Sequence, residues 1–175
     1  DAGCGLGLDD EVRAAVAAAA RLFEQAGAIV EPMRPFLTRQ MLDGMDHFWR
    51  MRSLVDMRQL APGQLDKVLP FIRQWAESAA AFDGAQVFEA GAQFHATRLA
   101  TVRACAPFDY VLSPVAPITA FAAELPAPTG DPLRPLEHIA FTVPFNMSEQ
   151  PAASIHCGHS ATGLPIGLQI AGQRF

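Results

Sequence analysis

Proline is the residue that most restricts how this chain can fold, because it lacks a backbone N–H and fixes its own φ angle. The chain has 14 prolines, and they are concentrated between Pro114 and about Pro135. The same segment shows neither a helical nor an alternating apolar period, so we expect a long, stiff loop there. Loops of this length in compact proteins often carry function.

Helix and strand patterns lie before this loop. Asp9 or Asp10 can cap a helix whose apolar residues recur every three or four positions and which ends at Gly27. Ile29 and Val30 then predict a short strand. A helix, a glycine and a strand in this order are typical of an α/β layer.

A helical block is predicted from about residue 38 to about residue 105. It comprises helices over 38–60 and 66–82, with Pro70 in a first turn or at a kink, and a longer helix capped by Asp83. The apolar face of this last helix is predicted to contain Val87, Phe88, Gly91, Phe94, Leu99 and Val102. We expect the block to contribute packing rather than chemistry.

Strands are predicted after Pro107. Residues 108–113 form an apolar run that leads into Pro114. Residues 153–157 and 166–171 flank a turn-rich segment, which predicts a C-terminal β-hairpin. The predicted fold class is therefore α/β.

Composition excludes several kinds of partner. The net charge is -5 and the basic residues are scattered, so no nucleic-acid partner is expected. No apolar stretch approaches the roughly 20 residues that cross a bilayer, so no membrane partner is expected either. Cys4, Cys105 and Cys157 are odd in number and far apart, which favours free thiols in the reducing cytoplasm.

Two motifs suggest a bound ligand. Gly3, Gly5 and Gly7 precede a helix, as in phosphate-binding loops, but no strand comes before them and acidic residues crowd the helix start. His156, Cys157 and His159 suggest a metal or a thiol nucleophile. In a regular strand, however, His156 would point away from His159. We therefore expect a loop entering a helix, a structural cysteine, and no metal or cofactor.

No hydrolytic nucleophile is predicted either. The chain lacks a G-x-S-x-G motif, and its only lysine, Lys67, falls in a polar turn between helices. We therefore assign no catalytic residue to these 175 residues.

Four motifs follow one another in the second half of the chain: FDYVLSPVAP at 108–117, TVPFNMSEQPA at 142–152, Cys157-Gly158, and LPIGLQIAG at 164–172. In this order they resemble the C-terminal half of amidase-signature enzymes. Residues 9–30 are similar to the helix and strand that follow that family's catalytic region. The resemblance implies part of a mixed central β-sheet flanked by helices, with the C-terminal hairpin.

The resemblance also implies a reaction, the hydrolysis of a small-molecule amide to a carboxylate and ammonia or an amine. The family's Ser-Ser-Lys triad lies upstream of the region matched here. Residues 1–175 are thus expected to be a single C-terminal fragment of an amidase domain that supplies sheet and cleft wall and is inactive alone. The alternative is a stand-alone binding or scaffold module. A reading frame upstream of Asp1 that encodes the triad would favour the fragment. Apolar surface left exposed on a fragment would favour self-association.

Position in the family pattern nominates five substrate-facing residues: Pro114, Ala116, Phe141, Thr142 and Asn146. The alternative is that the prolines only stiffen a loop and Asn146 caps a turn.

Three residues depart from the family pattern. Glu149 replaces a glycine, and His156 replaces a proline. Ile139 stands where amidotransferase subunits of the family that use glutamine carry an acidic residue, which disfavours a glutamine donor.

Overall fold

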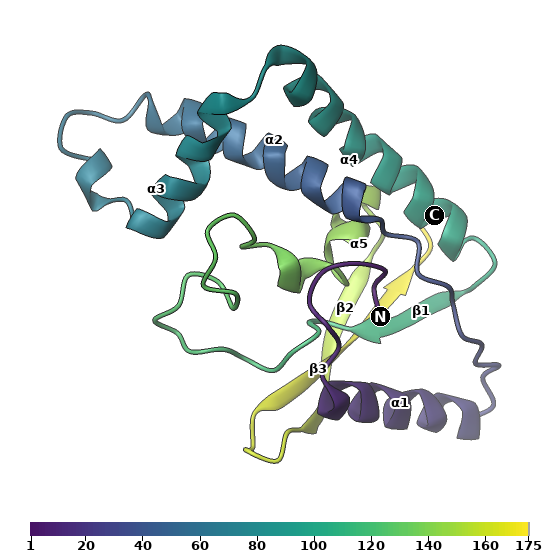
Figure 1. Ribbon diagram of the computed structural model, residues 1–175. Coiled ribbons are helices and arrows are strands. Elements are labelled where there is room, and N and C mark those ends of the chain that lie inside the picture. The colour runs from purple at the N-terminus through teal and green to yellow at the C-terminus, as the bar shows by residue number, and fades with distance from the viewer. Residues whose placement is uncertain (175) are drawn as a thin grey trace.

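A three-stranded antiparallel sheet forms the centre of the molecule (Figure 1). The computed structural model describes residues 1–174. Strands β1 (Tyr110–Pro114), β2 (Ala152–His159) and β3 (Pro165–Gly172) lie in the order β1-β3-β2. The predicted hairpin is confirmed as β2 and β3, and β1 adds to the other edge of β3, with Tyr110 opposite Gly172.

Helices cover the sheet. Helix α1 (Asp10–Gln25) contacts all three strands, and its Val12 is fully buried. Elsewhere on the sheet, Val111 of β1 and Ala171 of β3 form a core with Cys105 and Phe145. Figure 1 shows α1 separate from the other helices, which gather toward the opposite end of the molecule. The α/β fold class predicted from the sequence is thereby confirmed.

The remaining helices form a layer beside the sheet. Helices α2 (Arg39–Met57) and α4 (Gly84–Cys105) pack along one another, and α3 (Pro70–Glu77) packs against α2. The short helix α5 (Val143–Ser148) links this layer to the sheet. The single-turn helices η1, η2 and η3 complete the set, at Leu65–Lys67, Ser78–Ala81 and Glu137–Ile139.

The helix ends follow the predicted local chemistry. The Asp9 side chain caps α1 by accepting a hydrogen bond from the Glu11 N–H at 2.8 Å. Asp83 caps α4 and exchanges hydrogen bonds with Gln86 in a capping box. Gly27, just past α1, adopts a φ of +99°, which a residue with a side chain rarely adopts.

Two expectations about apolar residues were wrong. Ile29 and Val30 form no strand, and Ile29 is 92% exposed. A strand of two residues is stable only where a neighbouring strand lies beside it, and the described chain places none there.

The predicted apolar face of α4 was the second error, for three of its six residues. Val87, Gly91 and Phe94 are partly buried, and Phe94 packs against the core around α2. Phe88, Leu99 and Val102 are exposed, and Phe88 is 81% accessible. Small residues are buried on this helix instead, namely Ala90, Thr97, Thr101 and Cys105. Helices α2 and α4 approach closely, because a Cβ placed at Gly44 would overlap the Gln93 side chain. Only small side chains fit between closely packed helices, and the spacing of apolar residues does not indicate how close two helices will be.

Residues 115–136 contain neither helix nor strand. The Pro117 carbonyl accepts a hydrogen bond from the Asp9 N–H at 2.9 Å, which joins this segment to the start of α1. The Leu133 carbonyl accepts one from Arg50 at 2.6 Å, which joins it to α2.

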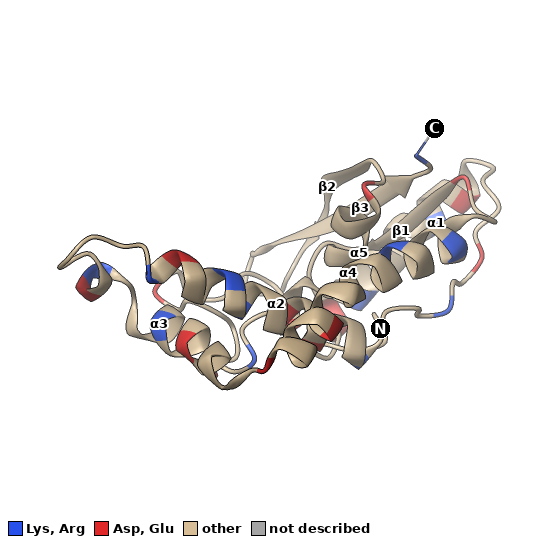
Figure 2. Cartoon of the chain, turned by 90° about the horizontal axis from the view of Figure 1, so that it is seen from above, with Lys and Arg blue, Asp and Glu red and all other residues tan. Residues whose placement is uncertain are grey.

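Charged residues are sparse on the sheet and interspersed along the helices (Figure 2). One buried pair of opposite charge lies on α2, between Asp46 and Arg50. Arg50 Nε donates to Asp46 at 2.8 Å, and the Trp75 indole N–H donates to the same carboxylate at 2.8 Å. This network joins α2, α3 and the proline-rich segment.

Replacing Arg50 by alanine should destabilise the chain by about 3–5 kcal/mol, because Asp46 would remain buried without its counter-charge. Denaturant unfolding followed by circular dichroism measures this loss. The control is Arg73→Ala, which removes the exposed Arg73–Glu77 pair on α3 and should leave the midpoint unchanged. Equal effects of the two substitutions would contradict the role assigned to burial.

Candidate functional site

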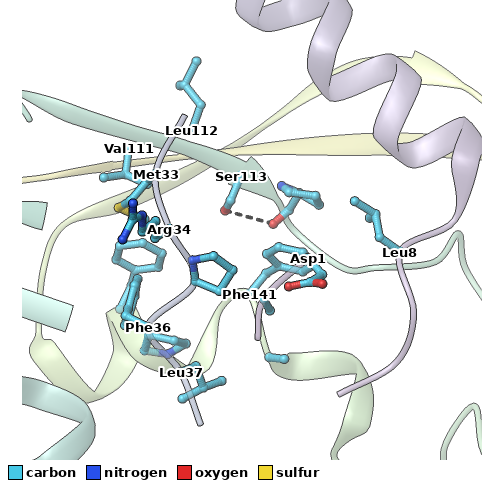
Figure 3. A pocket seen from close by; sticks show the side chains of 16 residues that line it. Asp1, Leu8, Met33, Arg34, Phe36, Leu37, Val111, Leu112, Ser113 and Phe141 are labelled. Carbon is cyan, nitrogen blue, oxygen red and sulfur yellow. Dashed lines mark hydrogen bonds between the residues drawn. The ribbon is translucent and has the colours of Figure 1, made fainter. Parts of the chain in front are cut away.

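A cavity of about 190 Å³ lies between β1, the start of α5 and two N-terminal segments. Figure 3 shows Met33, Arg34, Phe36 and Leu37 on one side of it and Asp1 and Leu8 on the other. The lining is mostly apolar, and it also includes these residues: Ala2, Pro35, Val111, Leu112, Ser113, Pro114, Ala140, Phe141, Pro144 and Phe145. Aromatic and aliphatic walls with few polar groups are typical of small-molecule sites.

One buried amide, on the neighbouring strand β3, holds two walls of the cavity together. The Gln169 Nε2 group, on β3, donates to the Ser113 hydroxyl at 2.8 Å and to the Phe141 carbonyl at 3.0 Å. Gln169 lies directly opposite Ser113 in the β1–β3 pairing. The side chain therefore ties both strands to the segment that precedes α5.

Ser113 is the hydroxyl that faces the cavity, but its surroundings do not activate it. It accepts from the Gln169 amide and donates to the Pro114 carbonyl at 3.1 Å, and neither group can take up a proton. Lys67 ends η1, just before α3 in the chain, and Figure 1 shows α3 at the other end of the molecule from β1. Among residues 1–174, these groups form no nucleophile–base pair.

The five nominated residues do not share one cavity. Pro114 and Phe141 line the cavity described above, whereas Ala116 lines a second cavity of about 180 Å³ beside β2 and β3. The Thr142 hydroxyl donates to the Ile139 carbonyl at 3.2 Å, and Asn146 is exposed on α5. Sequence reasoning missed the N-terminal lining, including Leu8, Met33 and Phe36, because these apolar residues carry no motif.

The glycine run at the N-terminus packs against η3 rather than forming an isolated loop. The Leu6 N–H donates to the Glu137 carbonyl at 3.0 Å. Gly5 has a φ of +90°, and a Cβ there would lie 2.6 Å from the same carbonyl oxygen. These glycines thus allow close backbone approach before α1 begins, as expected of a loop entering a helix.

Glu137 is a buried carboxylate beside this contact. Arg39 Nη1 donates to both of its oxygens, at 2.8 and 2.9 Å, and Arg134 lies 3.3 Å away. Burial alone would raise the pKa of Glu137, but hydrogen bonds and charge from Arg39 and Arg134 outweigh it and hold this pKa below its usual value.

Glu137 should therefore make stability depend on pH in acid. A lowered pKa in the folded chain stabilises it above the unfolded pKa of about 4.3, and this contribution is lost as pH falls through the folded value. Glu137→Gln should destabilise the chain by about 1–3 kcal/mol at pH 7. It should also reduce the fall in stability between pH 7 and pH 3. Urea midpoints measured from pH 3 to 7 test this.

Asp43→Asn is the matched control, because Asp43 also pairs with Arg39 but is half exposed. We expect Asp43→Asn to change the urea midpoint at pH 7 less than Glu137→Gln does, and to leave the fall of the midpoint toward pH 3 almost unchanged. If the urea midpoint of Glu137→Gln fell with pH as steeply as that of the unaltered chain, Glu137 would not be the source of this pH dependence.

Glu149 stands where the family pattern has a glycine, and its backbone angles and ion pairs show how a side chain is accommodated at this position. It ends α5 with φ 58° and ψ 26°, the left-handed conformation that glycine adopts most easily. Its carboxylate pairs with Arg98 at 3.2 Å and with Arg174 at 2.6 Å. The ion pairs partly offset the backbone strain.

Comparing two substitutions at position 149 separates strain from charge. Glu149→Ala loses the ion pairs and keeps the strain, whereas Glu149→Gly loses both. We expect the glycine variant to be more stable than the alanine variant by about 1 kcal/mol. Thermal unfolding at one pH and salt concentration tests this, and equal stabilities would show that position 149 is not strained.

A regular strand would point His156 and His159 to opposite faces of β2, but the structure places both on the same face. Their ring centres lie 4.4 Å apart. A β-bulge between His156 and Gly158 shifts the pairing of β2 with β3, which reverses the facing of the residues after it. The expectation failed because it assumed an unbroken strand.

The three cysteines, Cys4, Cys105 and Cys157, are free thiols, as predicted. Within residues 1–174 there is no grouping of three or more His, Cys, Asp or Glu side chains suited to a metal ion. No helix in the same described part is both long and apolar enough to cross a membrane.

Solved structures share this arrangement of sheet and helices. A bacterial aryl acylamidase of the amidase signature family superposes with a TM-score of 0.77 at 22% identity, over 97% of this chain and 38% of that one. The 6-aminohexanoate cyclic dimer hydrolase superposes with a TM-score of 0.75 at 23% identity, over 94% and 38%. At these identities the likeness defines the class of fold, that of amidase-signature enzymes.

The sequence matches the Amidase family over residues 4–175, and the chain therefore belongs to that family. It is 28% identical to a subunit of the glutamyl-tRNA(Gln) amidotransferase of Lachnospira eligens, over 98% of this chain and 40% of that protein. The subunit of the same name from Desulforapulum autotrophicum is 48% identical over 38% of this chain and 13% of that protein. The chain thus spans about 40% of the length of the Lachnospira relative.

Proposed function

We propose that these residues form the C-terminal part of an amidase that hydrolyses the carbon–nitrogen bond of a small-molecule amide, in the cytoplasm. The products would be a carboxylate and ammonia or an amine. The observation that carries the proposal is the family match over residues 4–175, together with an apolar cavity bordered by the nominated Pro114 and Phe141.

The Ser-Ser-Lys triad would lie on polypeptide that precedes this region. In such a triad, a neutral lysine takes the proton of the nucleophilic serine through the second serine. The hydrogen-bond partners of Ser113 support an upstream location of the triad, because neither partner is a base that could activate the Ser113 hydroxyl. This chain would contribute the wall that excludes water from the reacting amide.

The substrate wall would consist of Pro114 and Phe141 at the first cavity, Ala116 at the second cavity just after β1, and Thr142 and Asn146 at and within α5. Gln169 would keep Phe141 in position through the carbonyl of that residue. The exposed Ile155 lies on the face of β2 opposite to His156, and this face supports association with further polypeptide or self-association of the isolated chain.

Glutamine is a disfavoured donor for this site. Ile139 occupies the position of the acidic residue that would face an ammonium group. The nearby carboxylate of Glu137 is buried and already paired with Arg39 and Arg134.

The isolated 175-residue chain should not hydrolyse a panel of simple aliphatic and aromatic amides. Joined to the upstream part of its reading frame, it should release ammonia or amine from at least one of them. Reproducible turnover by the isolated chain would overturn the proposal, and inactivity of the joined protein would favour the scaffold alternative.

In the joined protein, Phe141→Ala should raise KM severalfold by removing apolar contact with the substrate. Phe88→Ala is the matched control, because Phe88 is an exposed phenylalanine on α4. Equal KM values for the two variants would remove Phe141 from the substrate wall.

A further inference from the structure

The β-bulge in β2 brings two histidines to one face of the sheet. His156 pairs with Gly167 and His159 pairs with Pro165, while Cys157 is the extra residue between them. Gly167 and Pro165 are two positions apart on β3, so they share a face. Their opposite residues, His156 and His159, must therefore share it as well.

The two imidazoles are close and accessible. Their ring centres lie 4.4 Å apart with the planes inclined at 55°, and both residues are exposed. Two imidazole nitrogens that bind one ion in neighbouring positions, with metal–nitrogen bonds of about 2.0–2.1 Å, hold their rings at a comparable separation.

We propose that His156 and His159 form a two-imidazole chelating site for a divalent transition cation. Imidazole nitrogen suits Ni²⁺, Cu²⁺ and Zn²⁺, whereas Mg²⁺ and Ca²⁺ prefer oxygen ligands. Waters would complete the coordination on the exposed side. The site is independent of amide hydrolysis and requires none of the residues of the proposed substrate wall.

The backbone around the pair favours chelation over a chance ring contact. Both histidines lie within a hydrogen-bonded strand whose pairing with β3 is set on each side of the bulge. The following turn is also held, because the Ala161 N–H donates to Glu11 of α1 at 2.7 Å. Ligands on a constrained backbone lose little freedom when they bind an ion.

Isothermal titration of the tag-free chain with NiCl₂ or ZnCl₂ tests the site. We expect saturable binding of one ion per chain and no heat of binding with MgCl₂. His156→Gln and His159→Gln should each weaken Ni²⁺ binding by at least about tenfold, because either change converts a chelate into a single ligand.

Two controls complete the experiment. His95→Gln alters an exposed histidine on α4 and should leave the affinity unchanged. Cys157→Ser should also leave it unchanged, because the proposal gives the thiol no part. Circular dichroism verifies that each variant is folded. The proposal fails if Ni²⁺ does not saturate, if binding survives both histidine substitutions, or if it depends on Cys157.

Discussion

The amide of Gln169 is the contact on which the arrangement of the site depends. Strand β3 has a neighbour on both sides, and Gln169 is buried in it. From there the side chain binds a hydroxyl on β1 and a carbonyl just before α5. A buried amide that lost these partners would be left unsatisfied, which costs more than the bonds contribute when made. The cavity walls are therefore coupled to the register of the sheet.

Two of the departures from the family pattern, Glu149 and His156, are accommodated locally. Glu149 adopts a glycine-like backbone conformation and meets two arginines, one from α4 and one from the end of the chain. His156, in place of a proline, occupies a strand position just before the bulge. Each departure leaves the sheet intact and adds a polar feature at its margin, an ion-pair cluster in one case and a histidine pair in the other.

The cavity offers apolar contact, and its hydroxyl is already paired. Its lining is apolar, and its hydroxyl, on Ser113, is occupied by an amide and a carbonyl. The carboxylate of the adjoining η3, Glu137, is neutralised by arginines. Under the proposed function, such a surface would exclude water and shape a substrate, and bond breaking would fall to groups outside the described residues.

Local chemistry was predictable from the sequence alone. Asp9, Asp83 and Gly27 define helix ends through hydrogen bonds and backbone angles that involve only neighbouring residues. The hairpin followed from two apolar runs around a turn, and the ordered motifs pointed to the family. The helix ends and the hairpin depend on residues close together in the chain, and the motifs depend only on their order along it.

Only the tertiary structure decided which distant residues meet. The face of α4 that is buried depends on how closely α2 approaches, and the absence of a strand at Ile29 depends on its neighbours. The cavity draws Leu8, Phe36, Ser113 and Phe141 from separate segments. The facing of His159 relative to His156 was set by a bulge, which arises from the pairing of two strands. Periodicity within one segment cannot report such contacts, because they depend on the position of another part of the chain.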